Sequence, residues 1–200
     1  RTEAIKALVK AGALLVAQTD LAMTPLHFAA FAGHREATKV LVKAGASLEA
    51  RADEATTPLH LAARMGHTEA ITALIDAGAS LEAQTDEGTT PLHLAAMEGR
   101  TEALKTLMAF GASLVAQGDS NFTPLHVAAL MGHREAIKVL VAAGASLEAQ
   151  ADEATTPLHL AARRGHAEVI AVLIELGASL EAQTNDKTTP LHEAAMEGRT

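Results

Sequence analysis

The sequence of 200 residues contains no cysteine, no tryptophan and no tyrosine. Without cysteine there is neither a disulfide framework nor a thiolate metal site, and we expect a reducing, cytoplasmic setting. No apolar run approaches the roughly 20 residues that span a bilayer, and residues 1–4 lack the apolar segment of a signal peptide. These absences predict a soluble intracellular protein without a transmembrane segment.

Positive charge is also scarce, since 16 Lys and Arg stand against 24 Asp and Glu and the formal net charge is −8. Proteins that bind nucleic acid need clustered basic residues to displace counterions, so the composition argues against such a partner. Hydrophobic residues make up 48% of the chain but aromatic residues only 2%. We therefore expect a thin core built from Ala, Leu, Ile and Val.

The tetrapeptide Thr-Pro-Leu-His recurs every 33 residues and contains all six prolines of the chain. Thr at an N-cap accepts a hydrogen bond from a free backbone N–H, and Pro at the first helical position loses no intrahelical bond. Each copy therefore predicts the start of a helix. The tetrapeptides begin at Thr24, Thr57, Thr90, Thr123, Thr156 and Thr189, which divides a single domain, 1–200, into the units 1–23, 24–56, 57–89, 90–122, 123–155, 156–188 and 189–200.

Two short helices are expected in each repeat. The first runs from Pro58 to Met65 and ends at Gly66, and the second begins near Thr68 and ends at Gly78. Helices this short are marginal in isolation because nucleation is costly. The chain must therefore stack its repeats into a solenoid, with paired alanines allowing close approach.

The run Thr57-Pro58-Leu59-His60-Leu61-Ala62-Ala63, followed by Gly66-His67, Leu74 and Gly78-Ala79, resembles the ankyrin repeat. The match extends over the whole chain without an insertion. The resemblance implies an all-α solenoid of stacked antiparallel helix pairs with projecting β-hairpin loops. It also implies that the tetrapeptide histidines make structural hydrogen bonds, and that the chain binds protein.

Two features of the loops depart from the family. The glycine that the family has in its hairpins is kept at Gly88. At the equivalent positions of the other repeats, a residue that needs positive φ costs on the order of 1 kcal/mol of stability, with the exception of Asn121. The asparagine that some members hydroxylate is replaced, so no such modification is expected. The other hairpin positions hold Ala22, Ala55, Asn121, Ala154 and Lys187, and the asparagine positions hold Glu49, Glu82, Glu148, Glu181, Val16 and Val115.

A longer period is superimposed on the 33-residue repeat, because residues 1–101 and 100–200 share 74 identities. Gene duplication or modular construction explains this copy, and the alternative is a pair of equivalent surfaces for a dimeric or periodic partner. The chain begins and ends at the same phase of the repeat, without polar capping repeats. Either the chain belongs to something longer, or its ends stack head to tail between molecules.

Ten histidines raise the question of metal binding or catalysis. Equivalent side chains in stacked repeats lie about 8–10 Å apart, too far to share one zinc ion. Neither a His-Glu-x-x-His pattern nor a phosphate loop is present. We expect no catalytic residues, no metal and no cofactor, and an enzymatic role only for a domain outside these residues.

Positions that vary between repeats are the candidates for binding, and the resemblance places one group of them on the concave side. Phe, Met and Leu recur there, which marks an interaction surface, and Arg163 and Arg164 indicate a basic end. We call this group the concave set: Met23, Phe31, Ala32, Thr56, Arg64, Met65, Thr89, Met97, Glu98, Phe122, Leu130, Met131, Thr155, Arg163, Arg164, Thr188, Met196 and Glu197.

The loops hold 13 of the 24 acidic residues but only Arg51 and Lys187 among the basic ones. Such an acidic ridge steers a basic partner, or else simply solvates and protects the hairpin edge. The loop acids are Asp20, Glu49, Asp53, Glu54, Glu82, Asp86, Glu87, Asp119, Glu148, Asp152, Glu153, Glu181 and Asp186.

The sequence therefore favours a monomeric protein-binding module that uses the concave face and the hairpin tips. A structural spacer or designed scaffold with no dedicated ligand, able to stack end to end, is the second hypothesis. Regular spacing suits the scaffold, whereas the irregular tips and the duplication suit a natural gene.

Overall fold

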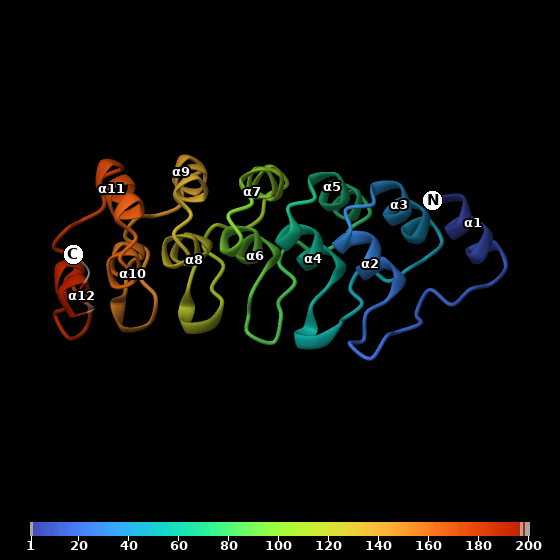
Figure 1. The fold of residues 1–200 in the computed structure, drawn as a ribbon, viewed down its shortest axis with the longest axis horizontal. Coiled ribbons are helices and arrows are strands. Elements are labelled where there is room, and N and C mark those ends of the chain that lie inside the picture. Colours follow the sequence, from blue (N-terminus) through green and yellow to red (C-terminus); the bar gives the residue numbers. More distant parts are fainter. Residues whose placement is uncertain (1, 197, 199–200) are drawn as a thin grey trace.

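The computed structural model describes residues 2–196 and Gly198, and it arranges them as two layers of short helices (Figure 1). The inner layer contains α2 (Pro25–Phe31), α4 (Pro58–Met65), α6 (Pro91–Met97), α8 (Pro124–Leu130), α10 (Pro157–Arg164) and α12 (Pro190–Met196). The outer layer contains α1 (Thr2–Lys10), α3 (Arg35–Lys43), α5 (Thr68–Asp76), α7 (Thr101–Ala109), α9 (Arg134–Ala142) and α11 (Ala167–Glu175).

Each inner helix packs against the inner helices before and after it, and each outer helix against its outer neighbours. The two helices of a pair, such as α4 and α5, also contact each other. The loops that lead into the inner helices project away from the outer layer (Figure 1). This arrangement confirms the all-α solenoid expected from the period.

The inner helices begin where the tetrapeptides predict. Thr57 has extended backbone at the N-cap of α4, Pro58 follows, and a capping box joins Thr57 to His60. The helix ends at Gly66, whose φ of 81° is left-handed. Helices of this length survive because both helices of a pair bury one face against the neighbouring pairs.

The core is thin, as its composition requires. Ala62 and Ala63 of α4 are completely buried between neighbouring inner helices, and Ile71 and Leu74 of α5 are buried below them. A side chain no larger than alanine lets adjacent inner helices approach closely. A larger residue at these positions would separate neighbouring repeats.

The loops differ from the β-hairpins that the resemblance implies, because no residue that the structure describes lies in a β-strand. Each loop is a tight turn closed by a few backbone hydrogen bonds, such as Ala52 N to Thr56 O at 2.9 Å and Thr56 N to Asp53 O at 3.2 Å. Its two arms are too short for a ladder of bonds. Three of these turns contain single 3₁₀ turns, at Asp53–Ala55, Asp119–Asn121 and Asp152–Ala154.

The turns keep the left-handed backbone for which the family uses glycine. Gly88 has a φ of 71°, and Ala55 and Ala154 have φ values of 57° and 58°. Residues before two of these positions are left-handed as well, with Glu54 at 58° and Glu153 at 57°. The non-glycine residues at these tips therefore have the positive φ that was expected to strain the backbone. Ala22, Asn121 and Lys187 also have positive φ.

Candidate protein-binding surface

The concave set lies at the ends of the inner helices and on the residues before each tetrapeptide. Phe31, the last residue of α2, is 45% exposed, and Met131, which follows α8, is 46% exposed. Met65, Met97 and Leu130 are half-buried against neighbouring residues. Met23 and Phe122 are half-buried too, and Glu197 lies outside the described residues. Phe31 and Met131 are thus the large apolar members most available to a partner among residues 23–131.

Phe122 has a structural task that its position in the sequence did not indicate. Its ring stacks on that of His126, with the ring centroids 5.7 Å apart and an interplanar angle of 7°. Its carbonyl accepts a hydrogen bond from His93 Nε2 at 2.8 Å. The stacking holds the ring and the hydrogen bond holds the backbone against the array, so only part of Phe122 faces outward.

The basic end expected at Arg163 and Arg164 is reduced, because Arg163 makes an ion pair within the chain. Its Nε and Nη2 donate to the two carboxylate oxygens of Glu193 at 2.8 and 2.9 Å. Glu193 is buried where the equivalent residue of the preceding repeat is Leu160. The hydrogen bond and charge of Arg163 lower the pKa of the Glu193 carboxyl, so the pair is ionised at neutral pH.

The other concave arginine is partly compensated as well. Arg64 Nε lies 3.4 Å from Glu98 of the next repeat, and the Arg64 side chain remains 55% exposed. Exposed pairs of this kind contribute little to stability. Arg164 is exposed and makes none of the described ion pairs, so it is the remaining cation of the expected basic end.

The tetrapeptide histidines join consecutive inner helices. His60 Nδ1 accepts from the Thr57 N–H at 3.2 Å, so Nε2 carries the proton and donates to Thr89 O at 3.0 Å. The same pair of contacts recurs in four other repeats. The structural role that the resemblance implied for these side chains is confirmed.

Burial favours the neutral form of four of these histidines, His27, His60, His93 and His126. It lowers the pKa of His60 and of His126 to about 4, and it also lowers the pKa of His27 and His93. The hydrogen bond from Nε2 to a carbonyl opposes this effect but is the smaller influence. At neutral pH these four side chains therefore place no charge inside the array.

A second column of histidines follows the glycines that end the inner helices. Nε2 of His67 hydrogen-bonds Phe31 O at 3.0 Å, and Nε2 of His133 hydrogen-bonds Met97 O at 2.8 Å. His166 does the same to Leu130 O, and in the remaining repeat Arg100 Nε donates to Arg64 O at 3.1 Å. The glycine is needed because a Cβ at Gly33 would lie 2.6 Å from the His67 ring.

The acidic ridge divides into two groups. Asp53, Glu54, Asp86, Glu87, Asp119, Asp152 and Glu153 are exposed at the turns, as expected. Glu49, Glu82 and Glu148 instead accept backbone N–H groups of the next repeat, from Ser80, Ser113 and Ser179, each at 2.8 Å. We call these three contacts carboxylate bridges. The spacing of 31 residues between each Glu and its Ser was visible in the sequence, but nothing in the sequence identified these glutamates as acceptors for those backbone N–H groups.

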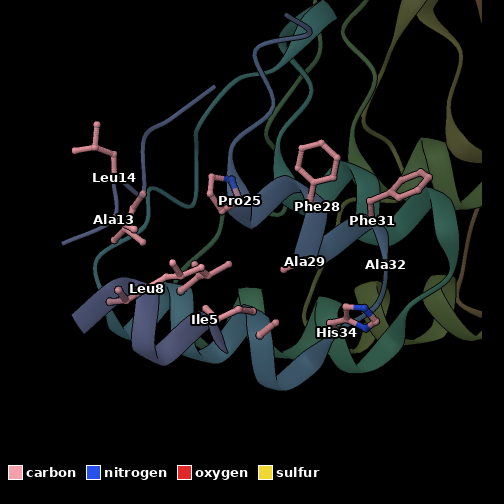
Figure 2. A pocket seen from close by; sticks show the side chains of 14 residues that line it. Ile5, Leu8, Ala13, Leu14, Pro25, Phe28, Ala29, Phe31, Ala32 and His34 are labelled. Atoms are coloured by element: carbon pink, nitrogen blue, oxygen red, sulfur yellow. The ribbon is translucent and has the colours of Figure 1, made fainter. Parts of the chain in front are cut away.

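An apolar groove of about 440 Å³ lies beside α1, and sequence reasoning did not predict it. Ile5 and Leu8 of α1 line one side, and Pro25 and Phe28 of α2 line the other (Figure 2). Leu8 and Phe28 are 61% and 49% exposed. The groove forms because residues 2–23 supply an outer helix without an inner one.

Comparison with known proteins agrees with this geometry. The sequence matches the family described as ankyrin repeats (3 copies) over residues 1–85, 78–151 and 146–200. The chain belongs to the ankyrin repeat family. It is also similar to the crystal structure of the human ASB11 ankyrin repeat domain, with a TM-score of 0.77 and 32% sequence identity over 86% of this chain and 77% of that one. No curated protein sequence matches the chain.

Ankyrin repeats generally mediate protein–protein interaction, and the family is typically not enzymatic. In this ankyrin array, the described residues contain no group of three His, Asp or Glu side chains placed to hold a metal ion. None of the described helices is both long and apolar enough to cross a bilayer.

Proposed function

We propose that this ankyrin array binds a partner protein on the concave set, with Phe31, Leu130 and Met131 as the principal apolar contacts. The observation that supports it is the exposure of Phe31 and Met131, at 45% and 46%, on the inner layer. Burying large apolar side chains supplies most of the binding energy at protein interfaces. The other members of the proposed site include charged and apolar residues, namely Arg64, Met65, Met97, Glu98 and Arg164.

The turn tips contribute a second part of the proposed surface. Seven acidic side chains are exposed there: Asp53, Glu54, Asp86, Glu87, Asp119, Asp152 and Glu153. Arg51 and Lys187 are the two basic residues that offset the negative charge of the loops. A field of one sign accelerates association with a partner that carries a basic patch, and salt weakens the effect. The partner class is therefore a protein with apolar anchors beside basic residues.

Affinity capture tests the proposal directly. The full chain is immobilised, partners are recovered from lysate, and their dissociation constants are measured for wild type and for Phe31→Ala combined with Met131→Ala. Loss of two anchors is expected to weaken binding by at least about tenfold, since hot-spot truncations cost about 2 kcal/mol or more. Unchanged affinity in a folded double variant contradicts the proposed site.

A matched control truncates exposed apolar residues of the outer layer. Phe110 and Ile174 are 41% and 42% exposed, close to the values for Phe31 and Met131. Phe110→Ala combined with Ile174→Ala removes similar apolar surface and is expected to leave partner affinity unchanged. A separate triple variant, Glu54→Gln, Glu87→Gln and Glu153→Gln, is expected to lower the association rate and its dependence on salt.

End-to-end stacking of copies is the second candidate function, and the apolar groove beside α1 favours it. Helix α12 of another copy offers an inner helix of the repeat pattern, with Leu191 and Met196 both 78% exposed. Light scattering over a range of concentrations tests this candidate. A constant monomer mass excludes it, whereas a mass that rises with concentration supports it.

A further inference from the structure

Neighbouring helix pairs are held together by packing and by three kinds of polar link. The first kind is the pair of side-chain bonds to backbone carbonyls, made by two histidines or by one histidine and Arg100, the second is the carboxylate bridge, and the third joins the tips of consecutive turns. Each kind can be followed from one boundary to the next, because the repeats have the same length and no insertion. Stability in repeat arrays is approximately a sum of repeat and nearest-neighbour terms, so a boundary that lacks links is locally weak.

The boundary between pairs α4/α5 and α6/α7 has all three kinds of link. His60 and Arg100 make the carbonyl bonds, Glu82 accepts from the Ser113 N–H, and Asp86 N donates to Glu54 O at 3.0 Å. Arg64 and Glu98 add an ion pair across the same boundary.

The boundary between pairs α8/α9 and α10/α11 is equally well linked. His126 and His166 bond across it, Glu148 accepts from the Ser179 N–H, and the Asn121 side chain donates to Asp152 at the tips. Arg134 lies 3.8 Å from Glu168 across this boundary. Both well-linked boundaries flank the one between α6/α7 and α8/α9, which we call the central boundary.

At the central boundary only the histidine bonds remain among the described residues. His93 reaches Phe122 O and His133 reaches Met97 O. Val115 occupies the position of Glu82 and Glu148, so Ser146 N–H has no carboxylate acceptor, and Val115 is itself 73% exposed. The described contacts include neither a tip bond between residues 85–89 and 118–122 nor an ion pair across this boundary.

We propose that the central boundary is the weakest interface between complete helix pairs, and that the chain opens there as two stiff blocks, residues 2–117 and 118–196. Local opening follows the least stabilised contacts of a structure. The central boundary also separates Met97 and Glu98 from Leu130 and Met131. Opening therefore changes the spacing between the two parts of the concave set. The proposal concerns the chain alone and does not depend on a partner.

The absence of tryptophan and tyrosine allows each block to carry its own fluorescent reporter. Phe110→Trp reports on the first block and Leu176→Trp on the second, and these equivalent positions are 41% and 39% exposed. Urea unfolding of the two single-tryptophan full-length chains is followed separately. The second block has fewer helix pairs, so Leu176→Trp is expected to show the lower midpoint. Coincident transitions at one urea concentration overturn the proposal.

Val115→Glu supplies the missing carboxylate bridge and sharpens the test. In this background, the two midpoints are expected to converge, and exchange of the Ser146 amide with solvent is expected to slow toward that of Ser113. The matched control is Val16→Glu, which adds the same charge at the equivalent exposed position opposite Ser47, away from the central boundary. Convergence of the midpoints in Val16→Glu, or a persistent gap in a Val115→Glu chain whose Ser146 amide is protected, also overturns the proposal.

Discussion

The inner helices and the turn tips belong to the same 33-residue unit, but they follow opposite rules. Thr-Pro-Leu-His is identical in all six copies, and in five of them the histidine is buried. The tips before it read Ala-Met, Ala-Thr, Gly-Thr, Asn-Phe, Ala-Thr and Lys-Thr, and the first residue of each has positive φ, which strains those other than Gly88 and Asn121. The tetrapeptide positions that bond to the next repeat are thus uniform, whereas the tip positions differ.

This contrast has a simple physical origin. A buried histidine with two hydrogen bonds has one geometry that satisfies it, and any change leaves polar groups without partners. A tip residue such as Ala55 or Lys187 costs about 1 kcal/mol or less, which the packed layers tolerate. Function can therefore vary at the tips and at the inner-helix ends without altering the architecture.

Acidification is expected to produce the largest effect, and it acts on the inner layer. The pKa of His60 and of His126 is lowered to about 4 in the folded chain, from 6.5. The unfolded chain therefore binds more protons below pH 6.5, and stability falls as the pH decreases toward 4. Each histidine contributes up to about 1.4 kcal/mol per pH unit well below pH 6.5 and less near it, so these two cost about 3 kcal/mol between pH 6.5 and 5.

Urea unfolding at pH 7, 6 and 5 measures this loss, and His27 and His93 add to it in the same direction. A His126→Gln chain provides the control. Its free energy of unfolding should decrease less steeply over this pH range, because the contribution of His126 is missing. A wild-type urea midpoint that stays constant from pH 7 to pH 5 contradicts the assignment of a neutral histidine column.

Removal of a single inner histidine is expected to have the next largest effect. His93→Ala leaves the Thr90 N–H and the Phe122 carbonyl without their partner, and each unsatisfied group costs about 1–3 kcal/mol. We expect about 3 kcal/mol in urea unfolding. His34→Ala is the matched control, because His34 is exposed at the edge of the groove. Equal losses in the two variants would show that the hydrogen bonds of His93 are not the cause.

Sequence alone predicted the part of the fold that repeats. The period placed the start of every inner helix, and the glycines marked helix ends such as Gly66. Periodicity identifies what recurs because a recurring residue meets the same neighbours in every repeat. The expected β-hairpins were not found, since arms of so few residues form the few backbone bonds of a turn and no ladder.

Contacts that depend on the neighbouring repeat were less predictable. Glu82 was interpreted as part of an acidic ridge, but its acceptor role requires the position of the Ser113 amide in three dimensions. Arg163 was interpreted as a cation available to a partner, but it donates to the carboxylate of Glu193 in the next repeat. Pairing the two required the geometry of stacked helices. The concave set as a binding site stays a prediction.

A smaller effect is expected at the tips. Ala55→Gly and Ala154→Gly relieve left-handed strain at φ values of 57° and 58°, and each is expected to stabilise the chain by about 0.5–1 kcal/mol. Gly88→Ala is the reverse change at the equivalent position, where φ is 71°, and should destabilise it by a similar amount. Thermal unfolding measures all three. A stabilised Gly88→Ala chain would show that the tips do not follow the backbone rule.

The smallest change in stability is expected at Glu193, a variable position within the inner layer of helices. Glu193→Leu restores the apolar residue found at Leu94 and Leu160, and the Arg163 side chain that loses this carboxylate is 42% exposed, so water can solvate its charge. We expect a change below about 1 kcal/mol in urea unfolding. Leu94→Glu is the reciprocal variant, because it places a carboxylate opposite Arg64 at the same 30-residue spacing. A loss above about 2 kcal/mol in Glu193→Leu would mean that the pair with Arg163 holds α12 in place, so that even this variable position serves the stack.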